Sequence, residues 1–216
     1  MDRNEHWEHV YGTNRFDEVS WYQPDARLSL ELIELVAPDR SARIIDVGGG
    51  ASTLVDGLID AGYRNLTVLD LAPAALRIAQ ERLGAAAGDV TWIAADILSA
   101  TLARASFDVW HDRAVFHFLT SGSDRQRYVD QVRTAVRPGG HVVIATFGED
   151  GPLRCSGLDV ARYSPHDLHA QFGEAFALVE SRLEQHTTPS GVRQSFTYCL
   201  CSVRENGRAD AEHRDV

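Results

Sequence analysis

The stretch Ile44-Ile45-Asp46-Val47-Gly48-Gly49-Gly50-Ala51-Ser52 decides the fold of this chain of 216 residues. A short apolar run typical of a buried strand passes into a glycine turn, and apolar residues at helical spacing follow over 54–59. Glycine has no Cβ, so Gly48 and Gly50 can take positive φ and let a ligand lie against the main chain. Unpaired N–H groups at the start of the next helix add a partial positive charge. The stretch therefore predicts a strand, turn and helix that bind a cofactor through the backbone.

An acidic residue follows at the spacing expected of a nucleoside site. Asp70 ends a second apolar run, 66–69, and a carboxylate there can accept hydrogen bonds from both hydroxyls of a ribose. Thr53 stands where the dinucleotide fingerprint needs a third small residue, and no Lys-Ser/Thr pair follows the glycines as in a P-loop. The pattern predicts a βαβ unit that binds a nucleoside.

Further signals follow in order along the chain. Asp96-Ile97 ends a third apolar run, Ser106 to Trp110 opens a fourth, and Arg137-Pro138-Gly139-Gly140 turns into a fifth. With the glycine turn and Asp70, these signals resemble the class I S-adenosylmethionine-dependent methyltransferases. The family implies S-adenosyl-L-methionine as cofactor, with S-adenosyl-L-homocysteine as product. It also implies an α/β fold: a Rossmann-like seven-stranded sheet, mostly parallel, with a C-terminal antiparallel hairpin and helices on both faces.

The resemblance also assigns roles within the cofactor site. It implies that Gly48 to Gly50 contact the methionine part and the ribose, that Asp70 binds the ribose hydroxyls and that Asp96 binds the adenine amino group. Ile97 offers a backbone contact to the ring, and His111 lies at the methionine end. The predicted cofactor-binding residues are Tyr11, Trp21, Asp46, Gly48, Gly49, Gly50, Asp70, Leu71, Asp96, Ile97 and His111.

Asp46 has two possible roles within this set. Its carboxylate either holds the glycine turn or receives the ammonium group of the cofactor.

Aromatic residues are dense over residues 1–25. Trp7 and Tyr11 are four residues apart and share one face of a short predicted helix. The segments 6–11 and 18–22 resemble the opening of a methyltransferase subgroup that contains small-molecule and protein-lysine enzymes. Two roles stay open here: the aromatic residues pack on the domain as a cover, or they form a lid whose rings face the sulfonium cation.

Candidates for acid-base chemistry follow the predicted fourth strand, 107–110. The Asp112-Arg113 pair resembles thiol and thiopurine methyltransferases, whose nucleophiles dispense with a strong base. Asp112 and His117 are the predicted catalytic residues, since a base is needed where the nucleophile arrives protonated. Arg113 could hold an anionic substrate; the alternative is an internal ion pair between Asp112 and a neighbouring Arg. His117 is alternatively a core or helix-surface histidine. The predicted substrate-binding residues are Tyr22, Arg113 and Cys155.

Three cysteines lack the spacing of a metal or disulfide motif and are predicted to be reduced thiols. Cys155 lies in a loop after the fifth strand, where this fold places substrate contacts. Cys199 and Cys201 share one face of a strand and are interpreted as core. Three converging thiolates would suit a metalloid, which is a minor alternative for the substrate. The histidines show no HxxxH spacing, so no metal is predicted.

The remaining pattern predicts one domain over residues 1–203 and a disordered tail over 204–216. The sheet should end in an antiparallel hairpin, because two strand patterns, 177–182 and 194–201, flank the turn 188–191. The other predicted elements are helices over 28–36, 72–83 and 125–136, a strand over 89–93, and a helix beginning at Pro165 after the cap Ser164.

Composition restricts the partners. A net charge of −10 without a basic run argues against nucleic acid. No apolar stretch approaches the roughly 20 residues that cross a bilayer, and the first residues lack a signal-peptide core, so a cytoplasmic protein without membrane contact is expected.

The leading hypothesis for function is transfer of a methyl group to a small nucleophilic acceptor by in-line displacement. The alternatives are a protein-lysine methyltransferase and a module that binds the nucleoside without catalysis. The sequence leaves the oligomeric state open.

Overall fold

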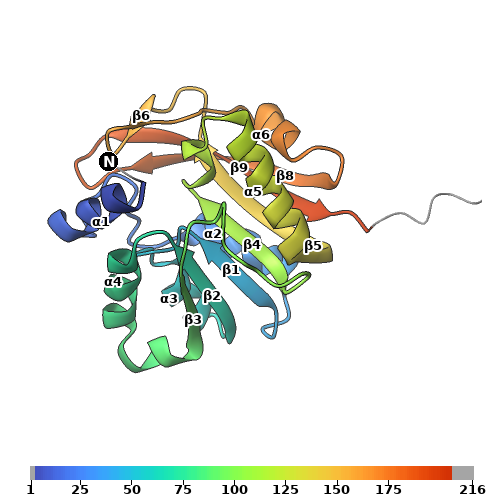
Figure 1. The fold of residues 1–216 in the computed structure, drawn as a ribbon, viewed down its shortest axis with the longest axis horizontal. Coiled ribbons are helices and arrows are strands. Elements are labelled where there is room, and N and C mark those ends of the chain that lie inside the picture. Colours follow the sequence, from blue (N-terminus) through green and yellow to red (C-terminus); the bar gives the residue numbers. More distant parts are fainter. Residues whose placement is uncertain (1–2, 206–216) are drawn as a thin grey trace, which may run out of the picture.

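A seven-stranded sheet organises residues 3–205, the part of the chain that the computed structural model describes (Figure 1). The strand order is β3-β2-β1-β4-β5-β9-β8. The first five strands of that order run parallel, whereas β9 pairs antiparallel with both β5 and β8. The strands are β1 (Arg43–Val47), β2 (Asn65–Asp70), β3 (Val90–Ala94), β4 (Phe107–Arg113), β5 (Val136–Phe147), β8 (Phe176–Thr187) and β9 (Arg193–Val203). The predicted fold class is confirmed, including the antiparallel C-terminal hairpin.

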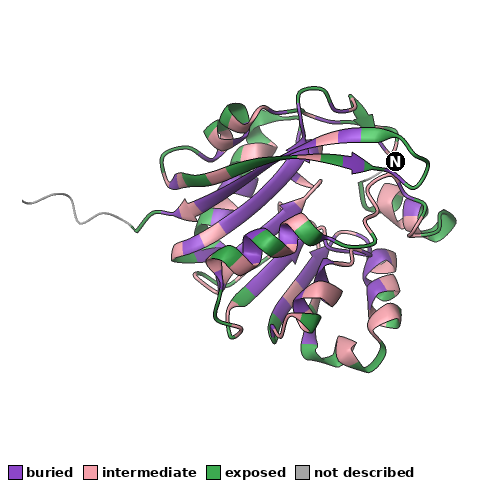
Figure 2. Cartoon of the chain, turned by 180° about the vertical axis from the view of Figure 1, so that it is seen from behind, coloured by how far each residue is buried: buried purple, intermediate pink, exposed green. Residues whose placement is uncertain are grey.

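Helices cover both faces of the sheet. Ile44 and Val109 pack on one face with α2, α3 and α4, whereas Ile45 and Trp110 pack on the other with α5 and α6. This division follows from the alternation of side chains along a strand. Figure 2 shows the buried residues concentrated on the central strands, with the edge strand β8 largely exposed. The helices are α1 (Arg3–Thr13), α2 (Arg27–Val36), α3 (Leu54–Asp60), α4 (Pro73–Leu83), α5 (Gly122–Ala135) and α6 (Pro165–Phe172).

Helix starts follow their capping residues. Ser164 accepts a hydrogen bond from the Asp167 N–H at 3.1 Å, and Pro165 occupies the first turn of α6, as predicted. Ser121 caps α5 in the same way, so that helix begins at Gly122, earlier than expected from its apolar pattern.

Strand β4 is longer than the sequence predicted. It continues to Arg113 instead of ending at Trp110. Because neighbouring side chains point to opposite faces, His111 lies toward α2 and Asp112 toward α5. Residues expected in a loop therefore lie inside the central strand, with Asp112 fully buried.

A short hairpin after β5 has no counterpart in the predicted elements. It pairs β6 (Arg154–Cys155) with β7 (Leu158–Asp159). The intervening residues Ser156 and Gly157 have φ of 48° and 79°, as a two-residue type I′ turn requires. A 3₁₀ segment over Gly84–Asp89 was not predicted either.

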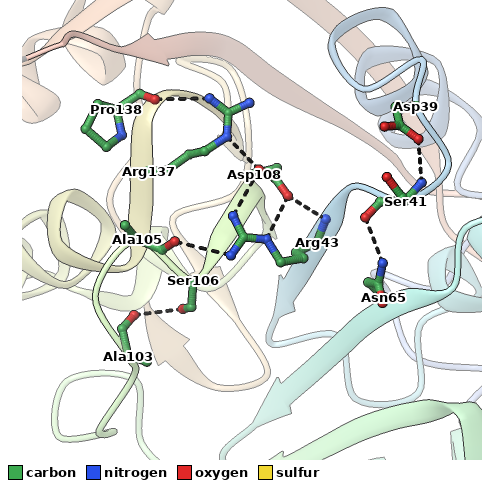
Figure 3. A network of polar contacts seen from close by, with 10 residues as sticks. All are labelled: Asp39, Ser41, Arg43, Asn65, Ala103, Ala105, Ser106, Asp108, Arg137 and Pro138. Atoms are coloured by element: carbon green, nitrogen blue, oxygen red, sulfur yellow. Dashed lines mark hydrogen bonds and ion pairs between the residues drawn. The ribbon is translucent and has the colours of Figure 1, made fainter.

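An ionic network holds the amino ends of three parallel strands together (Figure 3). Asp108 accepts hydrogen bonds from Arg43 Nε at 3.0 Å and from Arg137 Nε at 2.6 Å. These guanidinium groups, Arg43 first, hold the pKa of Asp108 well below its usual range. The network thus fixes the end of the sheet opposite to the carboxyl ends of β1 to β5.

The C-terminal part of the chain follows β9. Arg204 donates its backbone N–H to the Ala175 carbonyl at 2.9 Å. The rest of the predicted tail, 206–216, lies outside the described residues. Within 3–205, no helix combines the length and the apolar character needed to span a membrane.

Candidate active site

Two adjoining cavities lie at the carboxyl ends of the parallel strands, where open α/β sheets bind ligands. Both are lined by Gly48, Arg113 and the aromatic residues Tyr11 and Trp21. The first cavity extends along the ends of β2 and β3 and is also lined by Asp70, Leu71, Asp96, Ile97 and Cys155. The second extends beneath the glycine turn and is also lined by Ser29, Asp46, Gly49, His111 and Tyr22. The structure thus brings together all the predicted cofactor-binding residues except Gly50, which adjoins Asp70.

The glycine turn has no room for side chains. A Cβ on Gly48, where φ is 70°, would lie 2.0 Å from a methyl group of Val115. A Cβ on Gly50 would lie 2.6 Å from Asp70 Oδ2. The turn is held in place because the Gly48 N–H donates to the Leu69 carbonyl at 2.7 Å. The glycines therefore bring the main chain directly to the cavity wall.

Asp70 and Asp96 lie side by side at the ends of β2 and β3. The Ala95 N–H donates to the Asp70 carbonyl at 3.0 Å, which joins the two strand ends. Asp70 is buried, and its Oδ1 accepts from the Ala72 N–H at 2.8 Å. Burial raises the pKa of Asp70 to about 7. Asp96 is more exposed and accepts from the Leu98 N–H at 2.9 Å.

A buried chain of polar groups borders the second cavity. Asp46 Oδ1 lies 2.7 Å from His111 Nδ1, and His111 Nε2 lies 2.8 Å from Ser29 Oγ. The remaining Asp46 oxygen, Oδ2, is buried without a hydrogen-bond partner among the described residues. A buried acceptor without a partner is costly. This carboxylate is therefore suited to a donor group that enters the cavity.

Helix α1 covers the first cavity with aromatic side chains. Trp7 contacts Trp21 edge-to-face with centroids 5.6 Å apart, and it contacts Phe118 at 5.1 Å. Glu8 anchors the helix, because its carboxylate accepts from the Ala74 N–H at the start of α4 at 2.8 Å. Figure 1 shows α1 beside α4 at this end of the sheet. The amino-terminal aromatic residues thus pack on the domain and also form a wall of the cavity.

Burial changes the chemistry of Tyr11 in this wall. Its pKa is raised well above the usual range, chiefly by burial and then by the charge of Asp70. The hydroxyl therefore stays protonated at neutral pH.

Arg113 lines both cavities, and its guanidinium also has partners inside the protein. Its guanidinium donates to the Tyr198 hydroxyl at 2.9 Å, to the Trp21 carbonyl at 3.2 Å and to the Glu184 carboxylate at 3.2 Å. The group also lies 4.0 Å from the centre of the Phe196 ring. Its ion pair is with Glu184 and not with Asp112. Each of the three guanidinium nitrogens thus donates a hydrogen bond within the protein, and these bonds use three of its five N–H groups.

The structure also argues against Asp112 and His117 as catalytic residues. Asp112 accepts from the Tyr128 hydroxyl at 2.5 Å and from the Val115 N–H at 2.9 Å, and burial raises its pKa to about 7. His117 is enclosed beside Phe147, and burial lowers its pKa to about 3. Neither side chain lines either cavity. Both side chains lie in the core, apart from the two cavities.

The cysteines do not converge. Cys155 packs in the core layer of α2 and α3, whereas Cys199 and Cys201 pack on the opposite side of the sheet. Burial raises the pKa of Cys155 to about 11, so this thiol is protonated at neutral pH. Within residues 3–205, no cluster of three His, Cys, Asp or Glu side chains is suited to a metal ion. The three-thiolate hypothesis for a metalloid is therefore contradicted.

Several site residues were missed at the level of sequence. Phe118 lines the first cavity, Ser29 bonds to His111, and Glu184 bonds to Arg113. Ser29 gave one signal, as a polar residue on the apolar face of a helix. Glu184 gave none, because β8 reaches the site only through the antiparallel pairing of the hairpin.

Comparisons with known proteins agree with the fold. A family model described as a methyltransferase domain matches residues 44–140. The ubiquinone biosynthesis O-methyltransferase of Ralstonia nicotianae is 32% identical over 146 residues, covering 62% of this chain and 59% of that protein. The chain thus spans less than two thirds of this relative's length.

Solved structures resemble this chain over nearly its full length. A structure described by the conversion of a disulfide bond into a thioacetal group during echinomycin biosynthesis has a TM-score of 0.74 at 20% identity, covering 96% of this chain and 95% of that one. The Burkholderia thailandensis 1,6-didemethyltoxoflavin-N1-methyltransferase has a TM-score of 0.70 at 19% identity, covering 94% and 87%. Residues 44–140 thus match a methyltransferase domain, and the chain has the fold of the class I S-adenosylmethionine-dependent methyltransferases, with the glycine turn and the strand-end acids at its cavities.

Proposed function

We propose that the protein transfers a methyl group from S-adenosyl-L-methionine to a small-molecule acceptor. One observation carries the proposal: the side-chain-free turn Gly48 to Gly50 meets the buried carboxylates of Asp46 and Asp70 at one cavity system. A nucleoside joined to an amino acid offers hydroxyls to one carboxylate and an ammonium group to the other. The two carboxylates are therefore suited to accept hydrogen bonds from this cofactor.

Different residues of the two cavities bind different parts of the cofactor. In the first cavity Asp70 binds the ribose hydroxyls, Asp96 binds the adenine amino group, and Ile97 and Leu71 flank the ring. In the second cavity Asp46, held by His111, receives the ammonium group. The unpartnered Asp46 Oδ2 supports this assignment, because it gains a donor only when the site is filled.

When bound, the cofactor supplies a methyl group on a sulfonium, which is already an activated leaving group. The protein then has to align an acceptor and exclude water, and alignment alone can contribute roughly 7 to 11 kcal/mol. Trp7, Trp21 and Phe118 form the wall that excludes water around the reacting atoms. Cys155, at the same wall, contacts the acceptor as a protonated thiol.

The cover formed by α1 favours a small acceptor over a protein side chain. Trp7 and Trp21 contact one another across the first cavity, and both are held to the body of the protein. The named relatives include the Ralstonia O-methyltransferase and the toxoflavin N1-methyltransferase, and their names support a small-molecule acceptor here.

Calorimetry and a transfer assay test the proposal. S-Adenosyl-L-homocysteine should bind in calorimetry, and absence of heat at millimolar ligand would overturn the assignment. A tritiated-methyl screen of thiols, phenols, carboxylates, amines and a cell lysate, with products separated by size, should give labelled small molecules. Label found only on protein would replace the small acceptor by a protein substrate, and binding without transfer would leave a non-catalytic module.

A further inference from the structure

We propose that Arg113 and Glu184 are positioning residues for the cofactor site. They hold residues 20–23, here called the lid segment, at the wall shared by both cavities. A buried chain of polar groups then couples the lid segment to Asp46. The inference rests on the proposed function only where cofactor binding is invoked, because the contacts themselves involve protein groups alone.

Side chains distant in sequence fix the lid segment. Arg113 on β4 donates to the Trp21 carbonyl at 3.2 Å. Gln23 Nε2 donates to Glu184 Oε1 on β8 at 2.9 Å. His186, also on β8, has its Nε2 2.8 Å from the Ser20 carbonyl. The position of the lid segment therefore depends on the central strand and on the edge hairpin.

The two strands are joined by a partly buried ion pair. The Arg113 and Glu184 side chains are 8% and 17% exposed, and Tyr198 bridges them. Tyr198 accepts from Arg113 Nε at 2.9 Å and donates to Glu184 Oε2 at 3.2 Å. We call the contacts among Arg113, Glu184 and Tyr198 the latch. Removal of one partner of a buried pair leaves the other charge uncompensated, so a single substitution should weaken the latch.

The same tyrosine continues toward the cofactor site. Burial raises the pKa of Tyr198 to about 12, and the neighbouring Ser29 hydroxyl opposes part of this rise. Ser29 Oγ in turn lies 2.8 Å from His111 Nε2. His111 Nδ1 reaches Asp46 Oδ1 at 2.7 Å. Hydrogen-bonded groups in such a network polarise one another. A donor that binds at Asp46 Oδ2 therefore alters the hydrogen bonds at the other end of this polar network. The buried path thus runs from the second cavity to the lid segment.

Hydrogen exchange of the ligand-free protein tests the latch. Glu184→Gln keeps the shape of the side chain but removes its charge. It should increase exchange of the amides over 16–23 by about tenfold, as expected for loss of a charge-assisted hydrogen bond. The matched control is Glu180→Gln on the same strand, where Glu180 pairs with Arg182, and it should leave these amides unchanged. Equal exchange in wild type and Glu184→Gln would overturn the latch.

A second variant covers the case in which Glu184→Gln fails to fold. Gln23→Ala removes only the lid-side contact and should also increase exchange over 16–23. Unchanged exchange in a folded Gln23→Ala protein would equally overturn the latch.

A double-mutant cycle measured by calorimetry tests the coupling. Glu184→Gln should weaken S-adenosyl-L-homocysteine binding at least about threefold. In a Ser29→Ala background, where the chain is interrupted, the same change should have a smaller effect. Equal effects in both backgrounds would overturn the coupling. If wild type fails to bind the ligand, the proposed function fails, while the exchange experiment still decides the latch.

Discussion

Tyr128 on α5 donates a 2.5 Å hydrogen bond to Asp112 on β4, and both side chains are fully buried. Trp110 Nε1 donates to the same tyrosine oxygen at 2.9 Å. The Asp-Arg pair that resembles thiol methyltransferases is thus divided between the two faces of the sheet: Asp112 anchors α5, and Arg113 holds the lid segment.

Tyr128→Phe should reduce stability without altering cofactor affinity. It leaves an Asp112 oxygen and the Trp110 indole without their shared partner, at a cost of about 1 to 3 kcal/mol. Thermal unfolding and calorimetry check the two parts. A large loss of affinity in a folded variant would return Asp112 to the active site.

Asp70→Asn should weaken S-adenosyl-L-homocysteine binding by roughly tenfold or more, because hydrogen bonds to a charged group contribute about 1.5 to 3 kcal/mol. Calorimetry measures the change, with Asp108→Asn as a control at the other end of the sheet. Unchanged affinity would remove Asp70 from the site.

The pKa of Asp70 makes binding pH-dependent. Burial raises the pKa to about 7, so the carboxyl is largely protonated below pH 7 in the ligand-free protein. The ionised form accepts from both ribose hydroxyls, and affinity should therefore rise between about pH 6 and pH 8. Calorimetry across this range should show the slope in wild type and lose it in Asp70→Asn. A slope that persists in the variant would assign the titration to another group.

A raised carboxyl pKa makes the free energy of unfolding fall as pH rises, whereas the affinity for the ligand rises. A carboxyl whose folded pKa is raised stabilises the protein most at low pH, and this contribution is lost as pH rises through the folded value. Asp112 also has a pKa raised to about 7. The free energy of unfolding should therefore fall less steeply from pH 4 to pH 7 in Asp112→Asn than in wild type. Denaturant titrations at each pH measure this difference, and parallel curves would contradict it.

Gly50→Ala should destabilise the protein and weaken cofactor binding. The added Cβ would lie 2.6 Å from Asp70 Oδ2 and 2.9 Å from Ala75 Cβ, and overpacking of this kind costs about 1 to 3 kcal/mol. Gly88→Ala is the matched control, since no atom lies within 4 Å of its added Cβ. Equal melting temperatures and affinities for the two variants would show that the turn tolerates a side chain.

The glycine turn, Asp70 and Asp96 were predictable because they depend on local backbone chemistry and on the ends of strands. The roles of the residues on and after β4 were harder to predict. Asp112 and His117 carry groups typical of acid-base catalysis, but strand alternation and burial turn them into the core, and the sequence alone does not give the end of a central strand. Glu184 lies 71 residues from Arg113 along the chain. Its role depends on the pairing of β8 with β9 and of β9 with β5, which brings residues distant in sequence to the end of β4.

The ionic network of Asp108, Arg43 and Arg137 lies at the amino ends of the parallel strands. Because β9 runs antiparallel to β5, the chain reaches Glu205 at this same end. An affinity tag or surface linker attached after Glu205 would thus extend from the end of the sheet that lies opposite the cavities. Protein immobilised through that end would keep both cavities and the lid segment turned away from the support during ligand screening.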